Sequence, residues 1–256
     1  RPWKLNGRGV STDKATALSI AMGEMLERTI SGLYDQNREI IETSPKDMLN
    51  KHKAFYTPKS HRFLEIQKKS FPELCMDENA SIQWVRGRNL VTGQGVFIPR
   101  SITSWFRENR KKDKLLFIEA TSNGAAGYFT RPGAVLRGLL EVIQRDAFFV
   151  HWLTMDPPRL INSDSMPDNI RATIDDFRER GITIYVLDAT DVPIPSVLAV
   201  AITEQAEVPQ VVLCGASALS FENAIESALK EMIVASEMFD YVDNKAIDLT
   251  PSQSRV

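Results

Sequence analysis

Residues 121–153, TSNGAAGYFTRPGAVLRGLLEVIQRDAFFVHWL, form the stretch that decides the fold predicted for this chain. The stretch opens with the turn-forming residues Ser122, Asn123 and Gly124 and places Pro132 just before a run of apolar positions. Proline is tolerated in the first turn of a helix, because its missing N–H would have no partner within the helix there. The pattern therefore predicts a turn followed by a long helix over residues 134–153.

A second long helix is predicted over residues 11–34, STDKATALSIAMGEMLERTISGLY, which open with capping residues and are rich in helix formers. The two helices share an E-x-x-[EQ]-R pattern, whose side chains lie on one face of a helix because of their i, i+3, i+4 spacing. The pattern comprises Glu24, Glu27 and Arg28 in the first helix and Glu141, Gln144 and Arg145 in the second.

Two interpretations of this repeated pattern stay open. Carboxylates on one helical face can flank a divalent cation and an arginine can bind a phosphate bidentately, so two such faces across a cleft would form a magnesium nucleotide site. Glu and Arg at i, i+4 also form exposed ion pairs worth only about 0.3 to 0.5 kcal/mol. Small residues beside the glutamates, such as Gly23 and Gly138, favour packed faces and hence the nucleotide site. The last predicted helix offers Glu226 and Glu231 as a weaker third member.

The rest of the chain mixes helical and strand patterns. Residues 81–99 predict a hairpin punctuated by Gly93 and Gly95, residues 115–120 predict a strand, and residues 39–75 predict short helical pieces broken by prolines. This mixture favours an α+β fold. The later elements are a helix over residues 168–180, strands over residues 182–188, 196–202 and 210–216, and a last helix over residues 220–241.

The composition is that of an ordinary globular protein, with 256 residues, 43% of them hydrophobic, and a formal net charge of −2. This charge gives no reason to expect nucleic acid or a membrane surface as partner, and no apolar run approaches the roughly 20 residues of a membrane span, so we expect a soluble cytoplasmic protein. Two cysteines and three histidines without metal-binding spacing argue against a zinc site or a disulfide framework. Because the chain begins with Arg1 and stops in mostly polar residues, we expect a fragment of a longer chain.

Three segments resemble the YcaO family, in the family's order. They are residues 7–28, GRGVSTDKATALSIAMGEMLER, residues 84–103, WVRGRNLVTGQGVFIPRSIT, and residues 121–153, where SNG followed by GLLEVIQRDAF is the more specific signature. The resemblance is closest to the cyclodehydratases that make azoline rings in ribosomally made peptides. It implies an α+β fold of antiparallel or mixed sheets with long helices around a nucleotide cleft. It also implies a single domain over residues 1–256 that lacks the family's C-terminal segment.

The resemblance implies ATP and magnesium as cofactors and assigns the residues that would hold them. It assigns no catalytic residue. The implied metal ligands are Glu24, Glu27, Glu141 and Gln144, and the implied nucleotide contacts are Arg28, Ser122, Asn123, Arg145 and Glu231.

This chain departs from the family's pattern at several of these positions. Ile20 stands where the family has Ser, and Gln144 stands where it has a second Glu. A glutamine can offer a carbonyl oxygen to a metal but not a charge. Further departures are Ala126 and Phe129 at small polar positions, Gly133 at an acidic position, and Val234 and Ser236 where Gln and Arg are expected.

The resemblance implies modification of peptide backbone amides, either cyclodehydration of Cys, Ser or Thr to azolines or thioamidation. The substrate side chain would attack the preceding amide carbonyl, and ATP would phosphorylate the resulting oxygen so that it can leave. The alternative is a diverged, non-catalytic subunit that binds precursor peptide or scaffolds an active partner, and an accessory factor to a methylthiotransferase is a third possibility. The expected partners are a precursor peptide, a leader-binding protein and a second copy in a homodimer.

Overall fold

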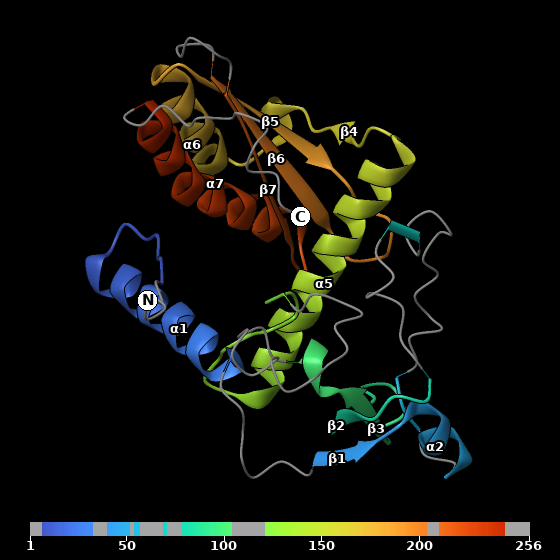
Figure 1. Ribbon diagram of the computed structural model, residues 1–256. Helices are drawn as coiled ribbons and strands as arrows, with labels where there is room; N and C mark the ends of the chain where they lie inside the picture. Colours follow the sequence, from blue (N-terminus) through green and yellow to red (C-terminus); the bar gives the residue numbers. More distant parts are fainter. Residues whose placement is uncertain are drawn as a thin grey trace. The chain divides into compact units, whose positions relative to one another are not determined.

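The computed structural model describes residues 7–32, 40–51, 54–56, 69–70, 78–103, 121–203 and 210–243. By its internal contacts the chain divides into two compact units, which are coloured along the sequence in Figure 1. Unit one comprises Arg1–Leu5 and Leu26–Ala125, and unit two comprises Asn6–Met25 and Ala126–Val256. The single domain expected over residues 1–256 stays a prediction.

Unit one holds a three-stranded antiparallel sheet in the order β1-β2-β3. The β2–β3 pair confirms the predicted hairpin, and Gly93 in its turn has a positive φ of 72°, which costs glycine little. The elements are β1 Ile40–Thr43, α2 Pro45–Asn50, β2 Ile82–Arg88, β3 Gly95–Pro99 and the short 3-10 helix η3 Arg100–Ile102.

The core of unit one is centred on Trp84, which is fully buried with Met48 and Ile82. A buried indole needs a partner for its N–H. Here Nε1 of Trp84 donates to the carbonyl oxygen of Thr43 at 3.0 Å, and the ring of Phe55 meets the indole edge-on at 5.4 Å. The indole therefore joins β1 to β2 both by packing and by a hydrogen bond.

The prediction of helical pieces over residues 39–75 is wrong at its start, because Ile40–Thr43 is strand β1, which pairs antiparallel with residues 82–85 of β2. A four-residue strand has too few residues to show a period, and its partner lies far along the chain. The first helix of this region, α2, begins only after Ser44, whose side chain accepts a hydrogen bond from the backbone N–H of Asp47 at 3.1 Å. The strand predicted over residues 115–120 lies outside the described residues.

Unit two holds a four-stranded antiparallel sheet in the order β4-β5-β6-β7. Its helices and its three longer strands confirm the predicted ones to within a few residues. The strands are β4 Arg159–Leu160, β5 Ile182–Asp188, β6 Ser196–Thr203 and β7 Gln210–Ser217. The helices are α5 Arg131–Thr154, α6 Asp168–Glu179 and α7 Phe221–Asp243, with the 3-10 turn η4 at Ser163–Ser165.

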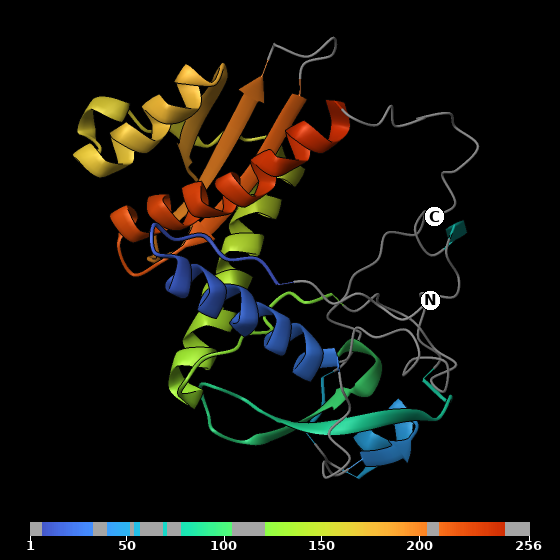
Figure 2. The ribbon, with the colours of Figure 1, turned by 90° about the vertical axis from the view of Figure 1, so that its left-hand side faces the viewer.

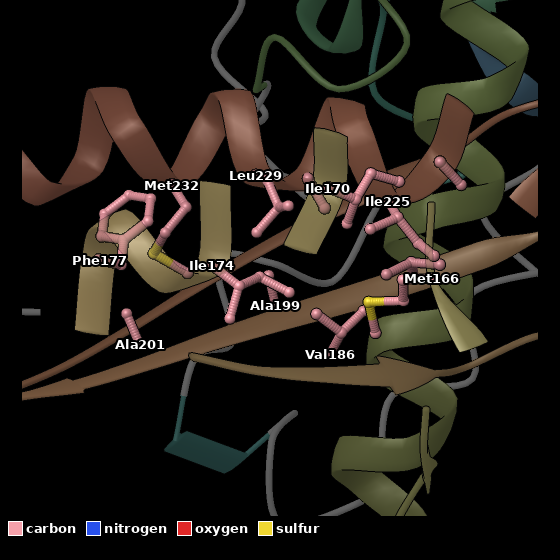
Figure 3. Close-up of a cluster of buried hydrophobic side chains, with 13 residues drawn as sticks. Met166, Ile170, Ile174, Phe177, Val186, Ala199, Ala201, Ile225, Leu229 and Met232 are labelled. Carbon is pink, nitrogen blue, oxygen red and sulfur yellow. The ribbon is translucent and has the colours of Figure 1, made fainter. Parts of the chain in front are cut away.

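Helices α6 and α7 cover one face of this sheet and enclose the main core (Figure 3). Helix α6 points a buried stripe of Ile170, Ile174 and Phe177 into it, at the i, i+4, i+7 spacing of one helical face. Helix α7 lies on β6 and β7 through small residues, because Ala224 and Ala228 are fully buried, as is Ala199 on β6. Alanines on both surfaces let the helix approach the strands closely.

Helix α5 packs on the opposite face of the sheet, beside β6 and β7 (Figures 1 and 2). The contact is a small cluster in which Ala147 of α5 meets Leu198 of β6 and Ala189, with Phe148 and Leu187 at its margin. Strand β7 therefore runs between a helix on each face, α7 on one side and α5 on the other.

Helix α1, Lys14–Gly32, confirms the predicted first helix and begins in unit two and ends in unit one. Its apolar side chains are largely exposed, with Leu18 60% and Ile30 66% accessible. None of them belongs to the buried cores found among the described residues. None of the helices in the described part of the chain is long and apolar enough to cross a membrane.

Truncation of the α6 stripe tests this core. Ile174→Ala removes a side chain that is 3% exposed, and we expect it to lower the free energy of unfolding by about 2 to 5 kcal/mol through lost burial and a residual cavity. Leu219→Ala, at a side chain 67% exposed, is the control and should change it by less than about 0.5 kcal/mol. Guanidinium unfolding followed by circular dichroism measures both, and equal effects would contradict the assigned core.

Candidate functional site

Helix α5 carries the second acidic pattern, and its start follows from local chemistry. Thr130 is extended and its side-chain oxygen accepts a hydrogen bond from the backbone N–H of Gly133 at 3.3 Å, which caps the helix. The helix then runs without a break through Glu141, Gln144 and Arg145. The predicted helical spacing of these three residues is confirmed.

Glu141 and Arg145 form an ion pair along the helix, with Nη2 of Arg145 3.8 Å from Oε1 of Glu141. The two side chains are 30% and 49% exposed, so water and salt screen the pair and its contribution to stability is small. The simpler interpretation of the pattern, an intrahelical ion pair, therefore describes this contact. Such a weak pair leaves both charged groups able to exchange partners.

Gln144 lies differently, because its side chain is turned inward and only 8% of the residue is exposed. It packs against Gly215 of β7, where a Cβ atom would come within 2.6 Å of Nε2 of Gln144 and 2.9 Å of Cδ2 of Leu198. Glycine at position 215 thus makes room for the amide. A strand glycine is a known sign of such close approach, and that signal was present in the sequence.

Cys214, next to Gly215, shows that two more of the predicted residues lie near β7. The pKa of its thiol is raised to about 11, first by burial and then by the carboxylate of Glu231, whereas the guanidinium of Arg145 lowers it. A nearby carboxylate raises and a nearby guanidinium lowers the pKa of a thiol in this way. Glu231 of α7 and Arg145 of α5 are therefore both within electrostatic reach of Cys214, although their helices pack on opposite faces of the sheet.

Glu24 of α1 is held by the segment that precedes the helix. The backbone N–H of Arg8 donates to a carboxylate oxygen of Glu24. Gly7 and Gly9 lie against the helix backbone, where a Cβ would come within 1.8 Å of the Ala21 carbonyl oxygen and 2.1 Å of the Ala17 carbonyl oxygen respectively. These two glycines serve close packing of chain on helix. By contrast, a Cβ on Gly23 would meet nothing within 4 Å, so the face at Gly23 is open and not the packed one predicted.

The remaining predicted residues, Glu27, Arg28, Ser122 and Asn123, lie in unit one. Glu27 and Arg28 are half-buried on the last turns of α1. Ser122 and Asn123 form an exposed turn in which the N–H of Ala125 donates to the Ser122 carbonyl at 2.9 Å and Gly124 has a φ of 79°. The turn predicted at SNG is confirmed, and the roles predicted for these four residues in nucleotide binding stay predictions.

Comparison with known proteins assigns the family. The family model described as YcaO cyclodehydratase, ATP- and Mg²⁺-binding, matches residues 6–255. The chain belongs to the YcaO family. One curated relative, an uncharacterized protein in the tfuA 3′ region of Rhizobium leguminosarum bv. trifolii, is 28% identical over 202 residues, which are 76% of this chain and 44% of that protein.

Two solved structures share the YcaO fold with this chain. A heterocyclase in complex with substrate and cofactor matches with a TM-score of 0.80 and 19% identity, over 94% of this chain and 34% of that one. YcaO from Methanopyrus kandleri bound with AMPPCP and Mg²⁺ matches with a TM-score of 0.69 and 17% identity, over 93% of this chain and 57% of that one. The α+β fold is thereby confirmed, and the chain spans less than two thirds of each of these relatives.

The residues of unit two fit ATP with magnesium by donor type. Glu24, Glu141 and Glu231 supply carboxylate oxygens, the hard ligands that magnesium prefers, and Arg145 supplies a cation suited to phosphate. Within the described residues, no group of three or more His, Cys, Asp or Glu side chains gathers closely enough to hold a metal ion alone.

The proximity of Arg145 and Glu231 to β7 can be tested through the thiol of Cys214. In a Cys75→Ser background, alkylation of Cys214 by iodoacetamide should be slow at pH 7 and should rise about tenfold per pH unit toward pH 11, because only the thiolate reacts. Glu231→Gln should lower the pKa of this thiol and Arg145→Gln should raise it. Mass spectrometry of samples quenched at successive times measures the alkylation rate of Cys214 at each pH.

Glu226→Gln is the matched control for this experiment, because Glu226 lies on the same helix as Glu231 but pairs with Lys230 at 3.4 Å. This substitution should leave the pH dependence of Cys214 alkylation unchanged. Equal alkylation profiles for the Glu226 and Glu231 variants would contradict the electrostatic effect of Glu231 on the thiol.

Proposed function

We propose that this chain takes part in the ATP- and magnesium-dependent modification of peptide backbone amides during maturation of a ribosomally made peptide. Membership of the YcaO family supports the reaction class. The observation that carries the proposal is the partly exposed ion pair of Glu141 and Arg145 on α5, whose side chains are 3.8 Å apart. A carboxylate and a guanidinium side by side are suited to a ligand that combines a cation and phosphate.

In this proposal the acidic residues hold magnesium and the arginines hold phosphate. Glu24, Glu27 and Glu141 bind the cation, and Arg28 and Arg145 bind phosphate oxygens. Arg145 reaches phosphate by leaving its weak pair with Glu141, and the carboxylate of Glu141 binds the cation. Gln144, which packs on Gly215, offers its side-chain carbonyl oxygen to the cation as a neutral fourth ligand. Ser122, Asn123 and Glu231 contact the nucleotide.

The chemistry that ATP supplies, when bound, is phosphorylation of an amide oxygen that is otherwise a poor leaving group. The residues of the chain contribute position and charge, which account for most of the catalysis in phosphoryl transfer. The installed product is an azoline formed from a Cys, Ser or Thr side chain, or a thioamide. A precursor peptide is the substrate, with a leader-binding protein and a second copy of the chain as further partners in the cytoplasm.

The second candidate function is a non-catalytic subunit that binds precursor peptide or scaffolds an active partner. Two observations favour it. Gln144, at a position where the family has a carboxylate, is neutral and 8% exposed. Phe129, at a position where the family has a small polar residue, presents a ring that is 97% exposed. Both replace a charged or polar group that the family uses for nucleotide.

Calorimetric titration of magnesium-ATP into the full chain separates the two functions. The enzyme predicts micromolar binding, and Glu141→Gln should weaken it about 10- to 150-fold, the equivalent of losing a contact of about 1.5 to 3 kcal/mol to a charged group. Glu179→Gln, at an exposed glutamate of α6 outside the predicted site, is the control and should bind like the parent. No heat from the parent chain at millimolar ATP would exclude the enzyme and favour the scaffold.

A further inference from the structure

Strand β7 lies at the edge of the sheet of unit two. The strand order is β4-β5-β6-β7, so within the described part of the chain β7 has β6 as its single hydrogen-bonded neighbour (Figures 1 and 2). An edge strand presents one row of backbone N–H and C=O groups away from the sheet. Which residues supply that row follows from the hydrogen bonds at the end of the strand pair.

The N–H of Ala218 donates to the carbonyl of Pro195 at 3.1 Å, one step beyond the pair Ser196–Ser217. In an antiparallel pair every second residue is bonded to the partner strand, so Ala216, Cys214 and Val212 direct their backbone groups to β6. The carbonyl of Ser196 accepts a hydrogen bond from the N–H of Ala189 at 2.9 Å, so Ser196 directs its backbone groups toward β5 and away from β7. This agrees with the alternation of inward and outward residues along β7. The outward row is therefore Val211, Leu213, Gly215 and Ser217.

At three of the four outward positions, Val211, Leu213 and Gly215, the side chain is apolar or absent, and only Ser217 is polar. Leu213 is 40% exposed and Val211 62%. Leu213 stands in one cross-strand row with Val200 and Tyr185, and residues directly opposite each other lie on the same face. Tyr185 is 43% exposed, whereas the next row, Leu187, Leu198 and Gly215, is covered by α5. Helix α5 thus covers the row that contains Gly215 but not the row that contains Leu213.

The edge also lacks the features that normally prevent strand addition. Natural edge strands carry charges, prolines or bulges that block pairing with another chain. The sequence of β7, QVVLCGAS, contains no charged residue and no proline, and its pairing with β6 runs in continuous register from Gln210 to Ser217. Residues 211–217 offer about 20 Å of straight edge at roughly 3.3 Å per residue.

We infer that β7 binds an extended segment of the substrate peptide as an added strand. The inference rests on the proposed function, and it names how the peptide is held. A row of alternating donors and acceptors is complementary to another extended backbone, and it recognises peptide without regard to most side chains. Apolar residues at alternate positions of the segment would cover Leu213 and Val211. The Gly215 end brings the segment beside Gln144, with Arg145 and Glu231 close to the neighbouring Cys214.

Amide hydrogen exchange resolved by NMR tests the inference. The probe is the β6 sequence SVLAVAIT with two lysines at each end, because this sequence already pairs with β7 on its inner edge. In the free chain the amides of Val211, Leu213 and Gly215 should exchange rapidly, while those of Val212, Cys214 and Ala216 are protected by β6. Millimolar probe should slow exchange of the outward amides by at least about tenfold and leave the inner ones unchanged.

Two protein variants and one control sharpen the result. Leu213→Pro removes an outward N–H without removing a bond to β6, since proline is tolerated on an edge strand, and should abolish protection. Leu213→Lys retains the backbone, which guards against misfolding of the proline variant, and should weaken probe binding by placing a charge on the edge. Leu219→Lys, at an exposed residue beyond the strand, should bind the probe like the parent chain.

Three results would overturn the inference. One is protection of the outward amides in the free monomer, which would mean that the chain covers its own edge. Another is protection that rises with protein concentration together with a dimer in sedimentation, which would assign the edge to a second copy. The third is no protection at millimolar probe. Magnesium-ATP calorimetry tests the proposed reaction independently of this experiment. If the probe protects the outward amides but the chain binds no nucleotide, the peptide site is supported and the proposed reaction is rejected.

Discussion

The packing of β7 between α7 and α5 is the constraint on which the arrangement of unit two depends. On one face the buried alanines of α7 and β6 allow a helix to lie close to the strands, and this closeness brings Glu231 within electrostatic reach of Cys214. On the other face Gly215 leaves the space that Gln144 fills. If either surface carried larger side chains, the helix would be held farther from the sheet and these residues would lose contact with β7.

This constraint gives a physical account of Gln144. An isolated carboxylate that is 8% exposed between a helix and a strand would need a cation or several hydrogen bonds, because burying an unpaired charge is costly. A neutral amide of nearly the same shape avoids that cost. Gln144 therefore suits a chain whose packing must hold without a bound metal, and it shifts whatever metal binding the chain retains onto the more exposed Glu141.

Much of the fold could be predicted because the long elements carry clear patterns. Helix α6 shows the apolar stripe of one buried face, and β6 shows the continuous apolar run of a strand buried on both faces. Strand β1 could not be predicted, since its identity depends on pairing with β2 and on Trp84 bonding to Thr43. The hydrogen bond of Arg8 to Glu24 and the electrostatic effects of Glu231 and Arg145 on Cys214 are also non-local, so spacing along one helix does not predict them.

The ion pair of Glu141 and Arg145 bears on whether nucleotide binding survives the departures from the family pattern. The pair is partly exposed and loosely spaced at 3.8 Å, so separating its members costs little. When a magnesium phosphate binds, Glu141 exchanges the guanidinium for the magnesium cation. Arg145 exchanges the carboxylate for the phosphate anion. The exchange conserves the number of paired charges and leaves neither group buried alone. The weak pair is thus a low barrier to ligand binding, and the loss of a carboxylate at position 144 is the larger obstacle, because the amide of Gln144 offers a cation no charge.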